Sequence, residues 1–264
     1  MNADYFAGVD VGALSTEVVI LGAHSDLAGY SIVETGASST DAAEEALSLA
    51  LAEAAMSRDQ IKKTTATGYG RVSVPFADQK VTEISCHALG VYHLFPDAGT
   101  VIDIGGQDSK VITVGKEGKV LDFTMNDKCA AGTGRFLEVM AAKLQVSLDR
   151  MGDLSLRADR EAPISSICTV FAESEVVSLV AQNHPKEEII RGLHGAIVNR
   201  IWNMVKALGV RGAVAMTGGV AKNRGVVALM EEKLGTSVQV YSEPQIVGAL
   251  GAALFAKRTV QAPL

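Results

Sequence analysis

The sequence predicts an α/β protein with two similar lobes, because one pattern of strands and loops occurs twice along the chain. In both copies an apolar strand ends in Asp-x-Gly, a second strand follows the loop, and a third strand returns after a turn. The first copy spans residues 5–34 and the second spans residues 100–123. A third glycine motif, Gly218-Gly219, follows another apolar strand. We therefore expect a duplicated fold whose lobes face each other across a cleft.

The first lobe is expected over residues 1–95 and the second over residues 96–243. In the second lobe, residues 186–208 keep apolar side chains on one helical face and are followed by Gly209, a common helix end. The stretch 244–264 is rich in small residues near its start. We expect it to form a helix that packs back on the first lobe.

Composition excludes several classes of function. Of the 264 residues 48% are hydrophobic, and the formal net charge of -6 gives no basic surface for nucleic acid. No apolar run approaches the roughly 18 residues that cross a bilayer. The three cysteines, without a recognisable signal peptide, indicate a reducing compartment. We expect a cytoplasmic protein that binds neither a membrane nor a nucleic acid.

The two Asp-x-Gly loops have the composition of a phosphate site. Glycines let backbone N–H groups approach a phosphate closely, and an aspartate at a strand end can hold a hydrated Mg²⁺ ion. Asp10 and Asp103 are the candidates for holding Mg²⁺ through water, and we expect them to face each other across the cleft. Gln107 and Asp108 are both candidates for orienting an attacking water. The remaining candidates of the two loops are Gly12, Ser15, Thr16, Gly105 and Gly106.

The third glycine motif has the composition of an adenosine site. Gly218 and Gly219 end an apolar strand and are expected to open a helix, where a flat ligand can lie against the backbone and Lys222 is close by. The segment Gly132-Thr133-Gly134 runs into Arg135 and lacks the Lys-Ser/Thr ending of a P-loop. In combination with the two Asp-x-Gly loops, the motif resembles that of the actin, Hsp70 and sugar-kinase superfamily.

Two of the three cysteines are each expected to be the residue just before a helix. Cys129 lies before the series Phe136, Met140 and Leu144, and Cys168 lies before another such stretch. A helix N-terminus favours thiolate over thiol, which suits a metal ligand. A cubane iron-sulfur cluster needs four cysteines, and a symmetric dimer would supply them from these two.

The alternative is that these thiols are ordinary buried cysteines, and spacing alone leaves both interpretations open. Cys86, which lies among apolar residues in a predicted helix, is expected to belong to the core. His194, on the apolar side of the long helix, is likewise expected to be a buried structural histidine rather than a ligand.

Five motifs together resemble the activator ATPases of 2-hydroxyacyl-CoA dehydratases. The resemblance covers nearly the whole chain in the right order, and one loop departs mildly, reading Gly12-Ala13-Leu14-Ser15-Thr16 where Gly-Ser-Thr is commoner. Relatives of that family are the ATPase subunits of benzoyl-CoA reductases and the reductases of double-cubane cluster proteins. The motifs that carry the resemblance are residues 66–71, 103–110, 125–136, 165–175 and 216–221.

The resemblance implies an ATP-driven electron donor. It implies a homodimer that holds one [4Fe-4S] cluster through Cys129 and Cys168 of both subunits, together with ATP or ADP and Mg²⁺. It places Gln245, at the start of the C-terminal helix, near the adenine, and the loop Gly132-Thr133-Gly134 near the phosphates. The implied partners are an iron-sulfur acceptor enzyme and an upstream ferredoxin or flavodoxin.

Two other classes of function stay open at this point. One is a small-molecule kinase of the same superfamily, and the other is a nucleotide-controlled filament protein of actin type. Both would function without iron and without the cysteines. Kinases of the superfamily usually devote large insertions to their substrate, whereas these lobes are near minimal. The small size of the lobes and the presence of the cysteine loops favour the electron-transfer activator. In such a protein ATP binding would alter the surroundings of the cluster.

Overall fold

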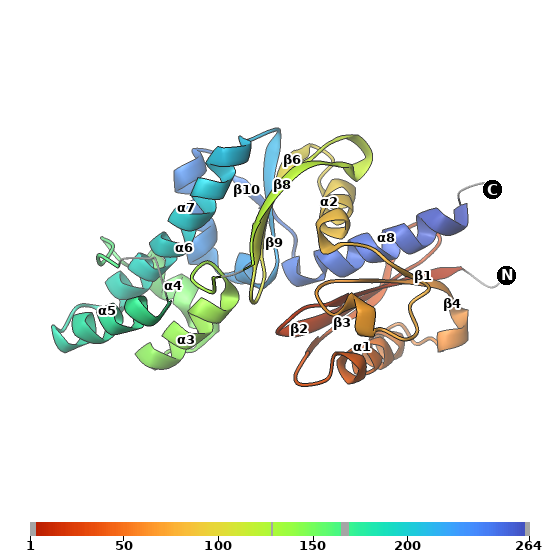
Figure 1. Cartoon of the computed structure of the whole chain (residues 1–264), viewed down its shortest axis with the longest axis horizontal. Helices are drawn as coiled ribbons and strands as arrows, with labels where there is room; N and C mark the ends of the chain where they lie inside the picture. The colour runs from red at the N-terminus through yellow and green to blue at the C-terminus, as the bar shows by residue number, and fades with distance from the viewer. Residues whose placement is uncertain (1–3, 128, 165–168, 262–264) are drawn as a thin grey trace. The chain divides into compact units, whose positions relative to one another are not determined.

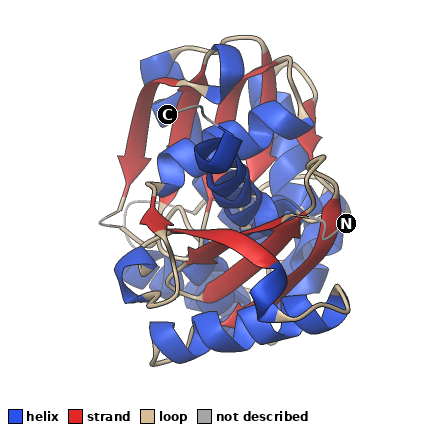
Figure 2. Ribbon diagram, turned by 90° about the vertical axis from the view of Figure 1, so that its right-hand side faces the viewer, coloured by secondary structure: helices blue, strands red, loops and turns tan. Residues whose placement is uncertain are grey.

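The computed structural model describes residues 4–127, 129–164 and 169–261 (Figure 1). The chain divides into two compact units. Unit 1 takes the described residues of Met1–Ala98, Val114–Leu121 and Tyr241–Leu264, and unit 2 takes those of Gly99–Thr113 and Asp122–Val240. Each unit contains a five-stranded sheet. Figure 2 shows the helices that lie beside the strands.

The sheet of unit 1 has the strand order β3-β2-β1-β4-β5. Strand β1 pairs antiparallel with β2 and parallel with β4. The five strands are β1 (Tyr5–Val11), β2 (Ser15–Leu21), β3 (Leu27–Glu34), β4 (Ile61–Thr67) and β5 (Gln79–Lys80). The helices are α1 (Ser39–Glu53), α2 (Glu83–Leu94) and α8 (Val247–Gln261), with short 3₁₀ turns at Arg58–Gln60, Arg71–Ser73, Lys116–Gly118 and Pro244–Ile246.

Both faces of the unit 1 sheet are covered, which explains the nearly continuous apolar character of β2. Successive side chains of a strand point to opposite faces. Val18 and Ile20 pack in the cluster that includes α1, and Val19 and Leu21 pack in the cluster that includes α8. Helix α8 approaches β1 so closely that a side chain at Gly8 would overlap the Ala249 carbonyl.

The sheet of unit 2 has the strand order β10-β9-β6-β7-β8. Strand β6 pairs antiparallel with β7, and β9 pairs parallel with β10. The strands are β6 (Ala98–Ile104), β7 (Ser109–Val114), β8 (Val120–Asn126), β9 (Ala213–Thr217) and β10 (Val238–Val240). The helices are α3 (Gly134–Leu144), α4 (Met151–Leu156), α5 (Thr169–Ala181), α6 (Lys186–Leu208) and α7 (Arg224–Leu234), with 3₁₀ turns at Leu148–Arg150 and Gly219–Lys222. Helices α3, α6 and α7 supply most of the apolar core of this unit.

The structure confirms the predicted α/β fold class with its repeated strand-loop-hairpin pattern. Each sheet contains three strands that are consecutive in the chain and adjacent in the sheet, β1 to β3 in unit 1 and β6 to β8 in unit 2. The long helix α6 has the predicted bounds and ends at Gly209, whose φ of 78° suits glycine. Among the described residues no helix is long and apolar enough to cross a membrane.

Two helices begin later than the sequence indicated. Helix α3 starts at Gly134 rather than directly after Cys129, because Thr133 is extended, with φ -137° and ψ 170°. Helix α7 starts at Arg224 rather than at Gly219, because Asn223 caps it by accepting from the backbone N–H groups of the next turn. In both cases a turn separates the glycine motif from the helix.

Candidate functional site

The two Asp-x-Gly loops close in the same way. In unit 1 the Gly12 N–H donates to the Ser15 carbonyl at 2.9 Å, and in unit 2 the Gly105 N–H donates to the Asp108 carbonyl at 3.0 Å. Each bond joins the residue two places after the aspartate to the residue five places after it. The predicted duplication therefore extends from the strands to the geometry of the loop itself.

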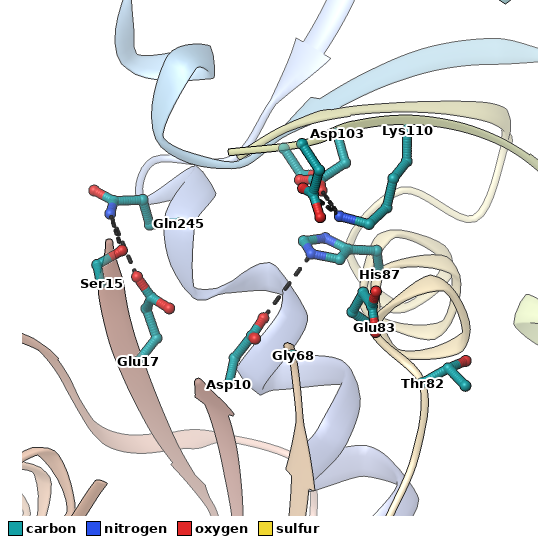
Figure 3. A network of polar contacts seen from close by, with 12 residues as sticks. Asp10, Ser15, Glu17, Gly68, Thr82, Glu83, His87, Asp103, Lys110 and Gln245 are labelled. Atoms are coloured by element: carbon teal, nitrogen blue, oxygen red, sulfur yellow. Dashed lines mark hydrogen bonds and ion pairs between the residues drawn. The ribbon is translucent and has the colours of Figure 1, made fainter. Parts of the chain in front are cut away.

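Asp10 is the next-to-last residue of strand β1 and is tightly packed. Its side chain lies against two backbones, because a Cβ atom at Gly68 or at Gly248 would overlap a carboxylate oxygen of Asp10. Gly68 has φ 83°, a conformation that favours glycine. The Nε2 atom of His87, from α2, lies 3.9 Å from Asp10 Oδ2 (Figure 3). Asp10 is thus held in one orientation although 8% of it is exposed.

The remaining unit 1 candidates surround the start of β2. The Gln245 side-chain amide lies 3.3 Å from Ser15 Oγ and 3.4 Å from Glu17 Oε1, so residues from the two ends of the chain meet here (Figure 3). Thr16 is fully buried, and its hydroxyl contacts Thr35, which also donates to the Gly12 carbonyl. Thr16 therefore supports the loop from inside the unit, whereas Ser15 is partly exposed.

Asp103 is the next-to-last residue of strand β6 and is fixed by neighbours in unit 2. The Thr217 hydroxyl donates to its Oδ1 atom at 2.9 Å, and the Lys110 ammonium lies 3.4 Å from its Oδ2 atom (Figure 3). Gly218, with φ 82°, brings its backbone so close that a Cβ atom there would lie 2.8 Å from Asp103 Oδ1. Gly218 therefore occupies the same position next to Asp103 that Gly68 occupies next to Asp10. Each glycine follows a threonine that ends the neighbouring strand.

The second loop also carries Gln107 and Asp108. Asp108 is engaged, since its Oδ1 atom accepts from Lys110 Nζ at 2.7 Å. Gln107 is exposed. Of the adenosine candidates, Gly218 is buried, while Gly219 and Lys222 are exposed on the 3₁₀ turn that follows β9.

The second loop is bonded directly to the start of α3. The Gly134 N–H donates to the Gly105 carbonyl at 2.8 Å, and the Arg135 N–H donates to the Gly106 carbonyl at 2.9 Å. Both carbonyls belong to the Asp-x-Gly loop, and both N–H groups belong to the first turn of the helix. The glycine segment Gly132-Thr133-Gly134 and the Asp103 loop are therefore connected by backbone hydrogen bonds.

Cys129 lies in the turn that precedes this helix and is half-buried against the unit 2 core. Its carbonyl accepts from the Asn126 side-chain amide at 2.9 Å, and Arg200 of α6 lies 3.4 Å from the Asn126 oxygen. The turn closes on the Ala130 carbonyl, which accepts from the Thr133 hydroxyl at 2.8 Å and from two backbone N–H groups. The other predicted ligand, Cys168, lies outside the described residues.

The structure confirms two residues as core. Cys86 is fully buried, and burial raises the pKa of its thiol to about 12, so it stays protonated. His194 is also fully buried and contacts the Asn223 side chain at 3.1 Å. In the part of the chain that the structure describes, no three His, Cys, Asp or Glu side chains gather into a group suited to a metal ion.

Sequence reasoning missed Glu17, Lys110 and His87. Glu17 and Lys110 lie seven residues after Asp10 and Asp103, inside strands that are otherwise uncharged and almost entirely buried. A charged residue in a buried strand is unusual, and its repetition at the same offset was the available signal. His87 had no comparable signal, because only the packing of α2 brings it to Asp10.

Comparison with known proteins gives a consistent set of matches. The model of the BadF/BadG/BcrA/BcrD ATPase family matches residues 7–256. The chain is 47% identical to the activator of lactoyl-CoA dehydratase from Anaerotignum propionicum, over 97% of this chain and 99% of that protein. It is 43% identical to the 2-hydroxyisocaproyl-CoA dehydratase activator of Clostridioides difficile, over 96% and 94% of the two chains.

Comparison with solved structures gives matches to the same kind of protein. The structure of the Clostridium difficile activator with bound ADPNP has a TM-score of 0.93, at 42% identity over 97% of this chain and 96% of that one. One of the benzoyl-CoA reductase subunits of Thauera aromatica is more distant in sequence, at 31% identity over 94% and 92%. A Streptomyces griseus ROK family glucokinase, with a TM-score of 0.61 at 13% identity over 96% and 99%, shares the fold alone. These likenesses confirm the duplicated fold of the actin and sugar-kinase type.

Proposed function

Because the chain belongs to the BadF/BadG/BcrA/BcrD ATPase family, we propose that it is an ATP-hydrolysing activator that delivers single electrons to a partner 2-hydroxyacyl-CoA dehydratase. One observation carries this proposal. Two relatives named as activators of such dehydratases are 43% and 47% identical to the chain over at least 94% of every protein compared. Similarity of that extent covers both loops, both glycine motifs and the cysteine segments.

The nucleotide part of the proposal rests on the paired loops. Gly12 and Ser15 in unit 1, and Gly105 and Gly106 in unit 2, would offer backbone and hydroxyl donors to the phosphates. Gly218, Gly219 and Lys222 would lie along the adenosine, with Gln245 near the adenine. The rigid closure of both loops supports this assignment, since a preformed loop loses little conformational entropy on binding.

The donor chemistry around the two aspartates fits a hydrated Mg²⁺ ion. Asp10 and Asp103 present oxygen ligands, which Mg²⁺ prefers, and both are held in a fixed orientation by their neighbours. The Lys110 ammonium next to Asp103 disfavours a second cation in direct contact with that carboxylate. Binding through water, as expected from the sequence, is therefore the mode that the charges favour.

The cluster part of the proposal assigns a [4Fe-4S] cluster to Cys129 and Cys168 of two copies of the chain. Thiolates are the usual ligands of such clusters, and Cys129 fits because it is half-buried on a turn rather than enclosed in the core like Cys86. When bound, the cluster would supply single low-potential electrons. The chain would anchor the Cys129 turn through Asn126 and Arg200. Ferredoxin or flavodoxin would be the upstream donor.

Two alternatives are less favoured. A benzoyl-CoA reductase-type ATPase subunit, or the reductase of a double-cubane cluster protein, would use the same sites. The identity of 31% to the Thauera aromatica benzoyl-CoA reductase chain is well below the values for the dehydratase activators. A sugar kinase shares only the fold, at 13% identity.

The experiment is ATP turnover by anaerobically purified protein, followed by activation of a purified 2-hydroxyacyl-CoA dehydratase. We expect Mg²⁺-dependent hydrolysis that falls by about 100-fold in Asp10→Asn and Asp103→Asn, since each removes a carboxylate that would hold the hydrated Mg²⁺ ion on the phosphates. Asp159→Asn, an exposed change in unit 2, is the control and should behave like wild type. If the protein hydrolyses ATP but does not activate the dehydratase, the activator part of the proposal is wrong and only the ATPase part stands. Absence of turnover would contradict the whole proposal.

A further inference from the structure

The two hairpins carry opposite charges at the same buried position. Asp10 pairs with Glu17 across β1 and β2, and Asp103 pairs with Lys110 across β6 and β7. Residues directly opposite on antiparallel strands project from the same face of the sheet. Glu17 is 5% exposed and Lys110 is 3% exposed, so each is a charged group inside a strand. Burial of a charge is costly unless a specific partner compensates it.

Lys110 contacts carboxylates at the two ends of the second loop. Its Nζ atom is 2.7 Å from Asp108 Oδ1 and 3.4 Å from Asp103 Oδ2. Asp103 precedes the glycines and Asp108 follows them, so a single ammonium group joins the residues on either side of Gly105, Gly106 and Gln107. Because both oxygens contact the same nitrogen, the two carboxylates are close neighbours. Without the ammonium between them they would repel each other in a poorly solvated place.

Gln107 occupies a different environment in the same loop. It is exposed, whereas Asp108 is engaged by Lys110 through a short charge-assisted hydrogen bond. A carboxylate committed to a buried ammonium is poorly placed to orient a water molecule. The exposed amide, which has both donor and acceptor atoms, is better suited to that task.

We propose that Lys110 is a positioning residue for ATP hydrolysis, which holds Asp103 and Asp108 so that Gln107, at the exposed part of the loop, orients the attacking water. The inference rests on the proposed function and refines it, because it gives Gln107 and Asp108 separate roles. Unit 1 differs at the equivalent position, where Glu17 accepts from the neutral Gln245 amide. The two loops are therefore alike in shape and unlike in charge.

The first test is Lys110→Met, which removes the charge and keeps most of the side-chain volume. We expect kcat for MgATP hydrolysis to fall by about 100-fold while KM for ATP changes by less than about threefold, since the effect is on alignment rather than on binding. The matched control is Lys143→Met. Lys143 also has a 2.7 Å ion pair, with Glu173, but its side chain is 41% exposed and it belongs to the last turn of α3, whereas the loop contacts the first turn. Wild-type kcat in folded Lys110→Met would overturn the inference.

A second set of variants adds further readouts, and its single variants Asp108→Asn and Gln107→Ala decide the matter even if Lys110→Met does not fold. Asp108→Asn should lower kcat by about tenfold, and the double variant should be no worse than Lys110→Met, because both changes break one contact. Gln107→Ala should lower kcat by about 100-fold at constant KM. Multiplicative effects of the Asp108 and Lys110 changes, or wild-type kcat in either Asp108→Asn or Gln107→Ala, would overturn the assignment of roles. If wild type itself does not hydrolyse ATP, the proposed function fails and the inference fails with it.

Discussion

The Asp10 carboxylate packs directly against backbone atoms, because two of its neighbours are glycines. Gly68 and Gly248 come from different elements, β4's end and α8, and each lets a backbone lie against the carboxylate. His87 Nε2, 3.9 Å from Asp10 Oδ2, borders the same side chain. A functional carboxylate gains precision when its rotamer is fixed by packing in this way.

Gly248→Ala tests that packing. The added methyl group would overlap Asp10 Oδ2 and lie 3.0 Å from His87 Nε2, so Asp10 must turn or α8 must shift. We expect a loss of about 1–3 kcal/mol in the free energy of unfolding and a fall in kcat/KM for ATP of at least about tenfold. Thermal denaturation and ATPase kinetics measure the two effects.

The control for Gly248→Ala is Gly235→Ala. Gly235 has φ 68° but nothing within 4 Å of its would-be Cβ atom, so alanine there strains the backbone without touching the site. It should lower stability and leave kcat/KM unchanged. If Gly248→Ala also retains wild-type kcat/KM, the close packing around Asp10 has no role in its positioning.

At the scale of elements, α6 and α7 meet through a buried histidine. Asn223 Oδ1 accepts from the Gly225 and Val226 N–H groups at the start of α7, which orients the Asn223 amide nitrogen toward His194 Nε2 of α6. The amide donates, so Nε2 accepts and the imidazole is neutral with its proton on Nδ1. Burial, with a smaller effect of the Arg191 charge, lowers the pKa of His194 to about 3.

This buried histidine predicts acid sensitivity of unit 2. In the unfolded chain the imidazole takes up a proton below its ordinary pKa of 6.5, whereas in the folded protein it stays neutral until about pH 3. Stability is therefore fully present above pH 6.5 and is lost as the pH falls, by up to about 1.4 kcal/mol per pH unit. Denaturant titrations of wild type and His194→Gln between pH 7 and pH 4.5 should show the steeper decline in wild type. Equal slopes would show that His194 is protonated in the folded state.

Helix positions could be predicted from the sequence where apolar spacing runs the full length of the helix. Helix α6 has such spacing and was predicted to the residue. Helices α3 and α7 were placed too early, because glycine motifs precede them and the true starts are set by an extended Thr133 and by the Asn223 cap. A cap depends on a few backbone angles, which spacing does not encode.

At the scale of the molecule, the duplication is visible in the sequence, whereas the structural role of the differences between its copies is not. Asp10, Asp103 and the loop glycines could be found because the same short motif occurs twice. The opposite charges of Glu17 and Lys110 can be related to the aspartates only when the strand register is known, because the register places Glu17 opposite Asp10 and Lys110 opposite Asp103. Gly248 could not be linked to Asp10 at all, because it lies at the other end of the chain and only the packing of α8 brings it there.

The proposed connection between nucleotide and cluster would also depend on the fold of unit 2. The Gly105 and Gly106 carbonyls accept from the first turn of α3, and the Cys129 turn leads directly into that helix. A change in the Asp103 loop on ATP binding would therefore be passed by two backbone hydrogen bonds to the turn that carries Cys129. Altered hydrogen bonding or exposure around a cluster changes its reduction potential.

The most direct test of the account is the reduction potential of the proposed cluster in anaerobically purified protein, measured without nucleotide, with ADP and with a non-hydrolysable ATP analogue. A coupling of about 1–3 kcal/mol, the usual range between linked sites, corresponds to roughly 40–130 mV for one electron. We predict a shift of that size between the ADP and ATP-analogue states, with a matching change in the rate at which an iron chelator removes iron. Iron bound in Cys129→Ser at the wild-type level, or one potential and one chelation rate in all three states, would contradict it.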